Sequence, residues 1–165
     1  MSKDILTPLQ LLGRREDTQL VLEINTAEQV RQILPRRLRL APSWNLLYSL
    51  DQDGTSMSTM YHKVKDKGPL ILAIKDMNDQ SIYLEENGSS SPKVKFYLWT
   101  GRNEYMILSE HNYLSVGGGD GRSALWIDSD FERGHSSCCD TFDNEILSSD
   151  SEFDCIGFEV WGFKN

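Results

Sequence analysis

Short strand-like runs separated by turn-forming residues are the feature that most constrains how this sequence can fold. In the clearest run Trp44, Leu46, Tyr48 and Leu50 alternate with polar positions, the pattern of a strand that is buried on one face. Similar runs occupy residues 70–74, 96–99, 105–108, 113–116, 124–127 and 156–163. Short strands at this turn-punctuated spacing predict a core in which sheet packs on sheet.

Two short helices are expected early in the chain, on the flank of this core. Thr26 and Gln29 have the spacing of a capping box, and apolar residues then recur at helical spacing up to Pro35. Ser56 can cap a second helix, which Gly68 and the proline after it bring to an end. The apolar face of this second helix consists of Met57, Met60, Tyr61 and Val64. Together with the strands, these helices predict an α+β fold.

The length of 165 residues fits one domain with one core. Residues 1–24 are mixed in character and include the polar stretch 13–18, so we expect them to form a loosely ordered N-terminal arm. We expect residues 25–165 to form the domain itself. Three cysteines, an odd number, do not indicate a disulfide framework, and the sequence shows neither a run of about 20 apolar residues nor a signal-peptide pattern. These features indicate an intracellular protein that is not embedded in a membrane.

The charge of the chain bears on its partners. A net charge of -8 and a pI near 4.8 argue against nucleic-acid binding, which needs a basic surface to follow the phosphates. The local exception is a basic stretch formed by Arg31, Arg36, Arg37 and Arg39. This stretch is either a solvated helix end that complements the helix dipole or a contact for an acidic partner or lipid headgroup.

A glycine cluster is the first candidate for a binding site. It consists of Gly117, Gly118, Gly119, Asp120 and Gly121. Glycine-rich backbone can cradle an anion, but a phosphate-binding loop continues with Lys and Ser or Thr into a helix, whereas this cluster leads into a strand-like run. We therefore predict a tight turn between two strands, with close backbone packing.

Other candidate sites have the wrong spacing. The acidic run 128–134 resembles a calcium loop, but its glycine comes one position late, so a solvated turn is predicted. No metal site and no cofactor is predicted from the histidines and cysteines. Cys138 and Cys139 lie near His135 in the sequence, which leaves a nucleophilic thiol open as an alternative. All four tryptophans, Trp44, Trp99, Trp126 and Trp161, fall in predicted strands and are expected to anchor the core.

Several motifs in order resemble the TLDc domain of the oxidation-resistance proteins, and the similarity is greatest to fungal members. Residues 44–61 are similar to the family's opening strand, turn and helix, and Trp99–Asn103 resembles its W-T-G-x-N motif. Leu114–Gly121 matches its glycine loop, and Leu125–Asp130 begins a stretch with the family's spacing up to Phe163. The resemblance covers about residues 28–163.

Two departures from the family pattern concern the middle and the C-terminal half. The family has a further hairpin after the strand that ends at Asp76, and the interval up to Phe96 is too short to contain it. The chain is therefore either a shortened member or a sequence that is incomplete at this place, and exposed sheet edges are expected. The second departure is at Gly134, where Arg133 and His135 stand in the reverse of the family's usual order, so no role of the family's histidine carries over.

The resemblance implies a two-layer antiparallel β-sandwich with flanking short helices. It also implies a non-catalytic, monomeric module that protects from oxidative damage by binding a protein assembly, such as the soluble sector of the vacuolar-type proton ATPase. The location implied is cytoplasmic, at the vacuolar membrane through the partner, with a mitochondrial location as the alternative. The partner-binding residues are expected in two loops: Gly117, Gly118, Gly119, Asp120, Gly121, Asp143, Asn144 and Glu145. The alternative function is a thiol-based peroxide-handling enzyme that uses Cys138 or Cys139.

Overall fold

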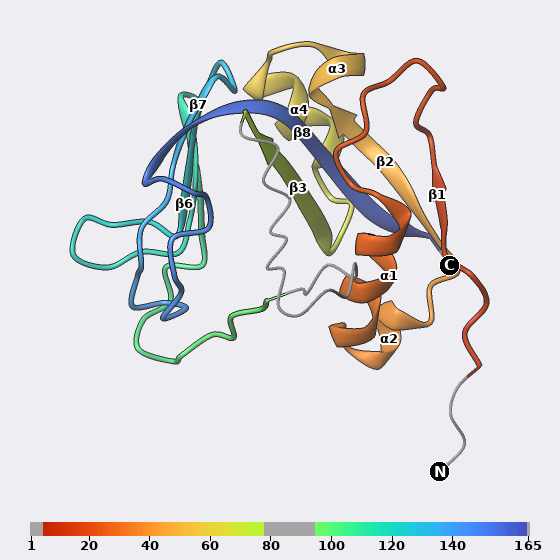
Figure 1. The fold of residues 1–165 in the computed structure, drawn as a ribbon, viewed down its shortest axis with the longest axis horizontal. Helices are drawn as coiled ribbons and strands as arrows, with labels where there is room; N and C mark the ends of the chain where they lie inside the picture. Colours follow the sequence, from red (N-terminus) through yellow and green to blue (C-terminus); the bar gives the residue numbers. More distant parts are fainter. Residues whose placement is uncertain (1–4, 78–94, 165) are drawn as a thin grey trace.

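A computed structural model describes the chain over residues 5–77 and 95–164. Within these ranges, eight strands join in one mixed sheet, and four short helices lie beside it (Figure 1). The strands are β1 (Gln10–Leu12), β2 (Ser43–Ser49), β3 (Leu70–Asp76), β4 (Ile107–Ser109), β5 (Tyr113–Val116), β6 (Leu125–Asp128), β7 (Arg133–His135) and β8 (Glu152–Lys164). The helices are α1 (Ile24–Ile33), α2 (Arg36–Arg39), α3 (Leu50–Asp53) and α4 (Met57–Val64). The expected α+β class is confirmed.

The last strand, β8, organises the sheet. Both β2 and β3 pair antiparallel with its C-terminal part, one on each side, while β7 pairs antiparallel with its first three residues. From β7 the sheet continues through β6 and β5 to β4. In Figure 1, β8 arches across the molecule and joins the two groups of strands. One strand therefore holds together segments from both halves of the sequence.

The sheet differs from the expected two-layer antiparallel sandwich. Seven strands lie on one hydrogen-bonded path, and β3 joins the same sheet by pairing with β8. Strand β1 runs parallel to β2, so a separation into two antiparallel layers is not shown. The reason is physical: alternation of apolar and polar residues determines which side chains face a core. It does not determine which strand pairs with which, or in which direction.

The larger core contains side chains from both groups of strands. Phe158 and Val160 of β8 pack with Tyr48 of β2, and with Leu114 and Ile127 of β5 and β6. Helix α4 covers this core with Met57 and Met60, and the hydroxyl of Ser56 accepts a hydrogen bond from the Thr59 N–H at 3.2 Å. The predicted helix, its cap and its apolar face are confirmed.

The second core lies on the opposite face of β8. Trp161 of β8 and Trp44 of β2 are fully buried there, beneath Leu9, Leu22 and α1. Residues 1–24 are expected from their composition to form a loose arm, whereas Leu9, Leu11 and Leu22 of this segment pack in the same core as the two tryptophans. The physical reason is that two indole rings in one core bury a large apolar area only if another segment covers them.

Helix α1 differs from its prediction in two respects. It begins at Ile24 after Glu23, whose side chain makes no capping bond, so the capping box predicted at Thr26 is wrong. Arg31 is 1% exposed, because its guanidinium donates hydrogen bonds to the main-chain oxygens of Thr7, Arg39 and Ala41. Arg31 is thus an internal residue and drops out of the predicted basic surface.

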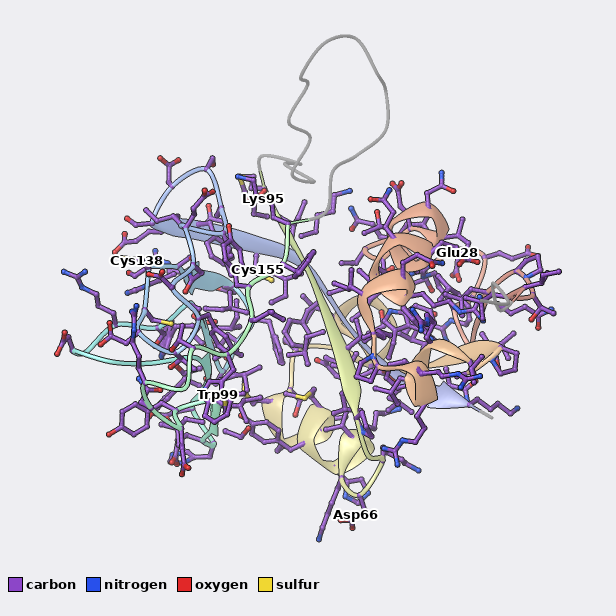
Figure 2. The ribbon with its side chains drawn as sticks, turned by 90° about the horizontal axis from the view of Figure 1, so that it is seen from below. Glu28, Asp66, Lys95, Trp99, Cys138 and Cys155 are labelled. Carbon is purple, nitrogen blue, oxygen red and sulfur yellow. The ribbon has the colours of Figure 1, made fainter. Side chains whose placement is uncertain are left out.

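The segment before β4 is also different from its prediction. Residues 96–99 were expected to form a strand, but they have no regular structure, and Trp99 is 53% exposed (labelled in Figure 2). The prediction that all four tryptophans anchor the core is right for Trp44 and Trp161 and wrong for Trp99, while Trp126 is half-buried. Residues 87–92, whose Gly, Ser and Pro content predicts a loop, lie outside the described residues.

None of the helices in the described ranges is long and apolar enough to cross a membrane.

Candidate functional site

The glycine loop, residues 117–121, joins β5 to β6, as the sequence predicts. The N–H groups of its first two residues are already used for internal bonds. The Gly117 N–H donates to the Met106 main-chain oxygen at 2.9 Å, and the Gly118 N–H donates to the hydroxyl of Thr141 at 2.9 Å. Amides that bond within the protein are not free to cradle an anion, so the geometry favours the structural interpretation of this loop over phosphate binding.

A buried polar network fixes the glycine loop to two other segments. Thr141 is fully buried, and its hydroxyl donates to Asn103 Oδ1 at 2.7 Å. Asn103 in turn donates from Nδ2 to the Gly118 main-chain oxygen at 3.2 Å. The Thr100 N–H donates to the Thr141 main-chain oxygen at 2.9 Å. Buried polar groups satisfied in this way restrict the loops to one arrangement.

Two glycines of the loop offer a matched test of this packing. Gly117 and Gly121 have almost the same backbone angle, φ +72° and φ +70°. A Cβ at Gly117 would lie 2.8 Å from the sulfur of Cys139 and 2.9 Å from the ring of Phe142, whereas a Cβ at Gly121 meets open space. The two positions differ in packing and hardly at all in backbone strain.

We predict that Gly121→Ala lowers the free energy of unfolding by about 1 kcal/mol, through the left-handed backbone alone. Gly117→Ala should cost roughly 1–3 kcal/mol more, because the added methyl group overpacks a buried contact. Urea unfolding of the two variants measures the difference. Equal losses of stability would show that the glycine loop is not packed as described.

The eight residues expected to bind a partner lie in neighbouring loops but are not equally exposed. Gly117 and Asn144 are buried. Asn144 accepts a hydrogen bond from the Cys139 N–H at 3.3 Å and donates one to the Ser137 main-chain oxygen at 2.9 Å, so it supports the loop from inside. Gly118 and Gly119 are half-buried. The exposed members are Asp120, Gly121, Asp143 and Glu145.

We call Asp120, Asp143 and Glu145 the acidic loop surface. Lys95 lies beside it, with its ammonium nitrogen 2.9 Å from Glu145 Oε2, and this hydrogen bond lowers the pKa of Glu145. Asp143 has a weaker contact with Arg102, whose guanidinium nitrogen is 3.9 Å from its carboxylate. All three residues are exposed, and the loops that carry Asp120 and Asp143 are joined through the bonds of Thr141. Such a surface can contact a partner without any chemistry of its own.

The acidic run 128–134 is a turn between β6 and β7. Asp128 Oδ1 accepts hydrogen bonds from the N–H groups of Glu132 at 3.0 Å and Arg133 at 3.3 Å. Phe131, in the middle of the run, is 1% exposed and packs in the larger core. In the parts of the chain that the structure describes, no three or more His, Cys, Asp or Glu side chains gather as a metal site.

The three thiols have different environments. Cys138 is exposed, with its sulfur 3.8 Å from a guanidinium nitrogen of Arg122. Cys139 is buried, and its Sγ donates to Asn144 Oδ1 at 3.2 Å. Burial raises the pKa of Cys155 to about 11. Figure 2 labels Cys138 among the surface loops and Cys155 farther inside.

We therefore predict that a thiol reagent at neutral pH labels one cysteine of the native protein rapidly and the other two only after unfolding. The reactive residue should be Cys138, since it is the exposed thiol. Mass spectrometry of the labelled peptides identifies it. Rapid native labelling of Cys139 or Cys155 would contradict the burial described here.

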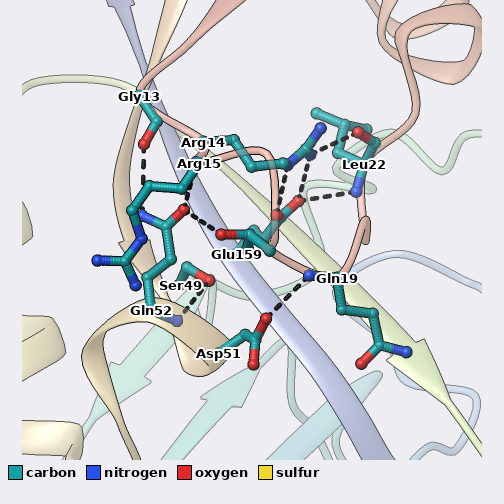
Figure 3. Close-up of polar contacts among 10 residues, drawn as sticks. Gly13, Arg14, Arg15, Gln19, Leu22, Ser49, Asp51, Gln52 and Glu159 are labelled. Atoms are coloured by element: carbon teal, nitrogen blue, oxygen red, sulfur yellow. Dashed lines mark hydrogen bonds and ion pairs between the residues drawn. The ribbon is translucent and has the colours of Figure 1, made fainter.

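A buried carboxylate that the sequence predictions missed lies on β8 (Figure 3). Glu159 is fully buried, and it accepts two bonds from the Arg14 guanidinium, at 2.8 and 3.0 Å, and one from the Leu22 N–H at 2.8 Å. Arg14 also lies over the Trp161 ring, 5.0 Å from its centre. An acidic residue in the middle of an apolar strand run is the signal that could have revealed this contact. Both carboxylate oxygens are used to hold the N-terminal segment, which makes Glu159 a structural residue.

Comparison with protein families matches residues 15–87 and 88–164 to the TLDc domain. The chain is 33% identical to Oxidation resistance protein 1 of Podospora anserina, over 94% of this chain and 64% of that protein. It is 34% identical to Oxidation resistance protein 1 of Yarrowia lipolytica, over 94% of this chain and 80% of that protein. It is 37% identical to human Nuclear receptor coactivator 7, over 87% of this chain but only 17% of that protein.

The comparisons also bear on the family hairpin for which the interval between Asp76 and Phe96 is too short. The alignment with the Podospora anserina protein extends over 222 residues and that with the Yarrowia lipolytica protein over 184, although this chain has 165, so both relatives contain residues without a counterpart here. The family match divides between residues 87 and 88, inside the interval where the resemblance predicts an absent hairpin. With the family matched from residue 15 to residue 164, the chain belongs to the TLDc domain family.

Proposed function

We propose that this chain is a non-catalytic TLDc module that takes part in protection from oxidative damage. It does so by binding and regulating a protein assembly, such as the vacuolar-type proton ATPase, and it meets that assembly as a cytoplasmic protein. Its relationship to proteins named Oxidation resistance protein 1 supports the protective role.

The observation that carries the binding role is the acidic loop surface on its rigid base. The carboxylates of Asp120 and Asp143 stand on loops fixed by the Thr141 network, so little conformational entropy is lost when a partner binds them. The same network takes up the Gly118 N–H and the side chains of Thr141 and Asn103 in internal bonds. A shaped and charged surface is what regulation by contact requires.

The test is co-sedimentation of the purified full chain with the soluble sector of the proton ATPase. We expect the parent chain to bind at micromolar concentration. The triple variant Asp120→Lys, Asp143→Lys and Glu145→Lys should lose binding, because it reverses the charge of the acidic loop surface. Absence of parent binding at that concentration would refute this assembly as the partner.

A matched control variant separates the effect of the acidic loop surface on binding from the effect of the chain's net charge. The triple variant Glu16→Lys, Asp17→Lys and Asp66→Lys makes the same change in net charge at exposed positions away from the glycine loop. It should bind like the parent. If both triple variants lose binding equally while retaining the parent's unfolding transition, long-range charge is responsible and the acidic loop surface is not the contact.

The second candidate function is a thiol-based peroxide-handling enzyme using Cys138 or Cys139. The observation that favours it is that Cys138 is the exposed thiol, with its sulfur 3.8 Å from a guanidinium nitrogen of Arg122. Within the described residues, neither thiol is hydrogen-bonded to His135, the base that the sequence offers. Consumption of peroxide by the purified chain, lost in Cys138→Ser, would support this alternative.

A further inference from the structure

Among the residues that the structure describes, the sheet ends at β4 with a free edge. In the sheet order β4 is the last strand, and among the described strands it pairs with β5 alone. Two bonds at 2.9 Å flank this pairing: Met106 accepts from the Gly117 N–H, and the Glu110 N–H donates to the Tyr113 oxygen. Between them, Leu108 is the register partner of Ser115. Hydrogen-bonded positions alternate along an antiparallel strand. The backbone groups of Ile107 and Ser109 therefore point away from β5.

The side chains along this edge are apolar and exposed on both faces of the strand. Tyr105, Met106, Ile107 and Leu108 are 67%, 42%, 56% and 50% exposed. Natural proteins usually protect a free edge with charged residues or proline, because an exposed apolar edge readily adds a further strand. These four consecutive residues contain neither. The edge therefore has both the backbone groups and the apolar surface that strand addition uses.

The charge around the edge indicates what kind of strand would bind. Residues 96–155, which contain β4 to β7, carry twelve Asp or Glu against three Lys or Arg, so the chain's net negative charge is concentrated here. Glu104 and Glu110 stand on either side of the apolar stretch, and both are exposed. A second copy of the chain is disfavoured, because it would bring two such acidic regions together, and pairing centred on Ile107 would place Glu104 opposite Glu110.

We propose that the free edge of β4 binds an extended segment of a partner protein as an added antiparallel strand. The segment has alternating apolar residues in its middle and Lys or Arg at its ends. The apolar residues cover Ile107 and its neighbours, and the basic ends meet Glu104 and Glu110. This proposal rests on the proposed function, the chain as a binding module, and names the chemistry of one segment that it recognises.

The experiment uses the full chain labelled with ¹⁵N and a nine-residue probe peptide with alternating Val and Thr at its centre and two Lys at each end. Saturable binding is expected, with slower hydrogen exchange of the Ile107 and Ser109 amides. A peptide of the same composition, N-methylated on alternate residues so that it cannot pair, should not bind. A peptide with Glu in place of Lys should bind at least about tenfold more weakly.

Variants of the chain test the two parts of the proposal separately. Ile107→Pro removes an outward N–H without removing a bond to β5, and should weaken binding about tenfold while the fold is kept. Glu104→Lys with Glu110→Lys should reverse the preference between the Lys and Glu peptides. Equal binding of the N-methylated peptide would refute strand addition, and equal binding of the Glu peptide would refute the basic partner. Concentration-dependent dimerisation that Ile107→Pro abolishes would identify a second copy as the occupant and also overturn the proposal.

The outcomes separate this inference from the proposed function. Suppose that the chain co-sediments with the proton ATPase sector, but the Lys peptide does not slow hydrogen exchange of the Ile107 amide. The proposed function is then supported and the strand-binding site on β4 is refuted. If the chain binds the Lys peptide through β4 but does not co-sediment, the strand-binding site is supported and the proton ATPase is refuted as the partner.

Discussion

Replacing Glu159 with leucine should lower the free energy of unfolding by about 3–5 kcal/mol, the cost of removing one partner from a buried ion pair. The Arg14 side chain is 12% exposed, and it would lose both carboxylate oxygens that neutralise it. The Leu22 N–H, buried against the same carboxylate, would lose its acceptor as well. Urea unfolding measures the loss, and limited proteolysis should show earlier cleavage before residue 24 than in the parent.

Two further variants identify the cause of this loss. Glu159→Gln keeps the shape and one oxygen acceptor, so it should be less destabilising than Glu159→Leu. Combining Glu159→Leu with Arg14→Leu removes both charges and should recover part of the stability, because no buried charge is then left unpaired. A Glu159→Leu chain as stable as the parent would show that residues 9–22 are not held to β8 by this pair.

Replacing Phe131 with alanine should cost about 3–5 kcal/mol, as expected for a buried aromatic side chain. Phe131 lies in the turn between β6 and β7, yet its ring centre is 4.8 Å from that of Phe158 on β8 and 5.6 Å from that of Tyr48 on β2. Its loss would remove the contact by which this turn joins the larger core.

The matched control for Phe131 is Phe96→Ala. The Phe96 side chain is 56% exposed, so its removal should change stability by no more than about 0.5 kcal/mol. Chemical denaturation of both variants gives the comparison. Similar losses at the two positions, or a negligible loss at Phe131, would contradict the described core.

The sequence predicted correctly those parts of the fold that depend on local signals. The α4 helix follows from Ser56 and its spacing to Val64, and the glycine loop follows from residues that favour a turn between strands. The pairing of β1 with β2 was missed, because three residues with no distinctive alternation carry it. The Arg14–Glu159 pair joins positions 145 residues apart, and no local pattern specifies which distant cation a buried acid will meet.

In the candidate site too, features that depend on nearby residues could be predicted from the sequence, and features that depend on tertiary packing could not. The glycine cluster could be identified by its composition, but its contact with Phe142 depends on how β5, β6 and the following loop pack together. For this reason Asn144 appears among the expected contact residues, although it is a buried support of the loop. Trp99 was expected in the core because tryptophan usually is buried, whereas its indole N–H donates to the Asn103 main-chain oxygen from an exposed position.

Survival of cells under peroxide distinguishes the proposed function, protection by binding a partner, from protection by thiol chemistry. Cells that lack their own copy would receive the parent chain, Cys138→Ser, or the Asp120, Asp143 and Glu145 triple lysine variant, at equal protein levels. We expect that Cys138→Ser protects like the parent and that the triple variant fails to protect. Loss of protection in Cys138→Ser, with full protection by the triple variant, would contradict it.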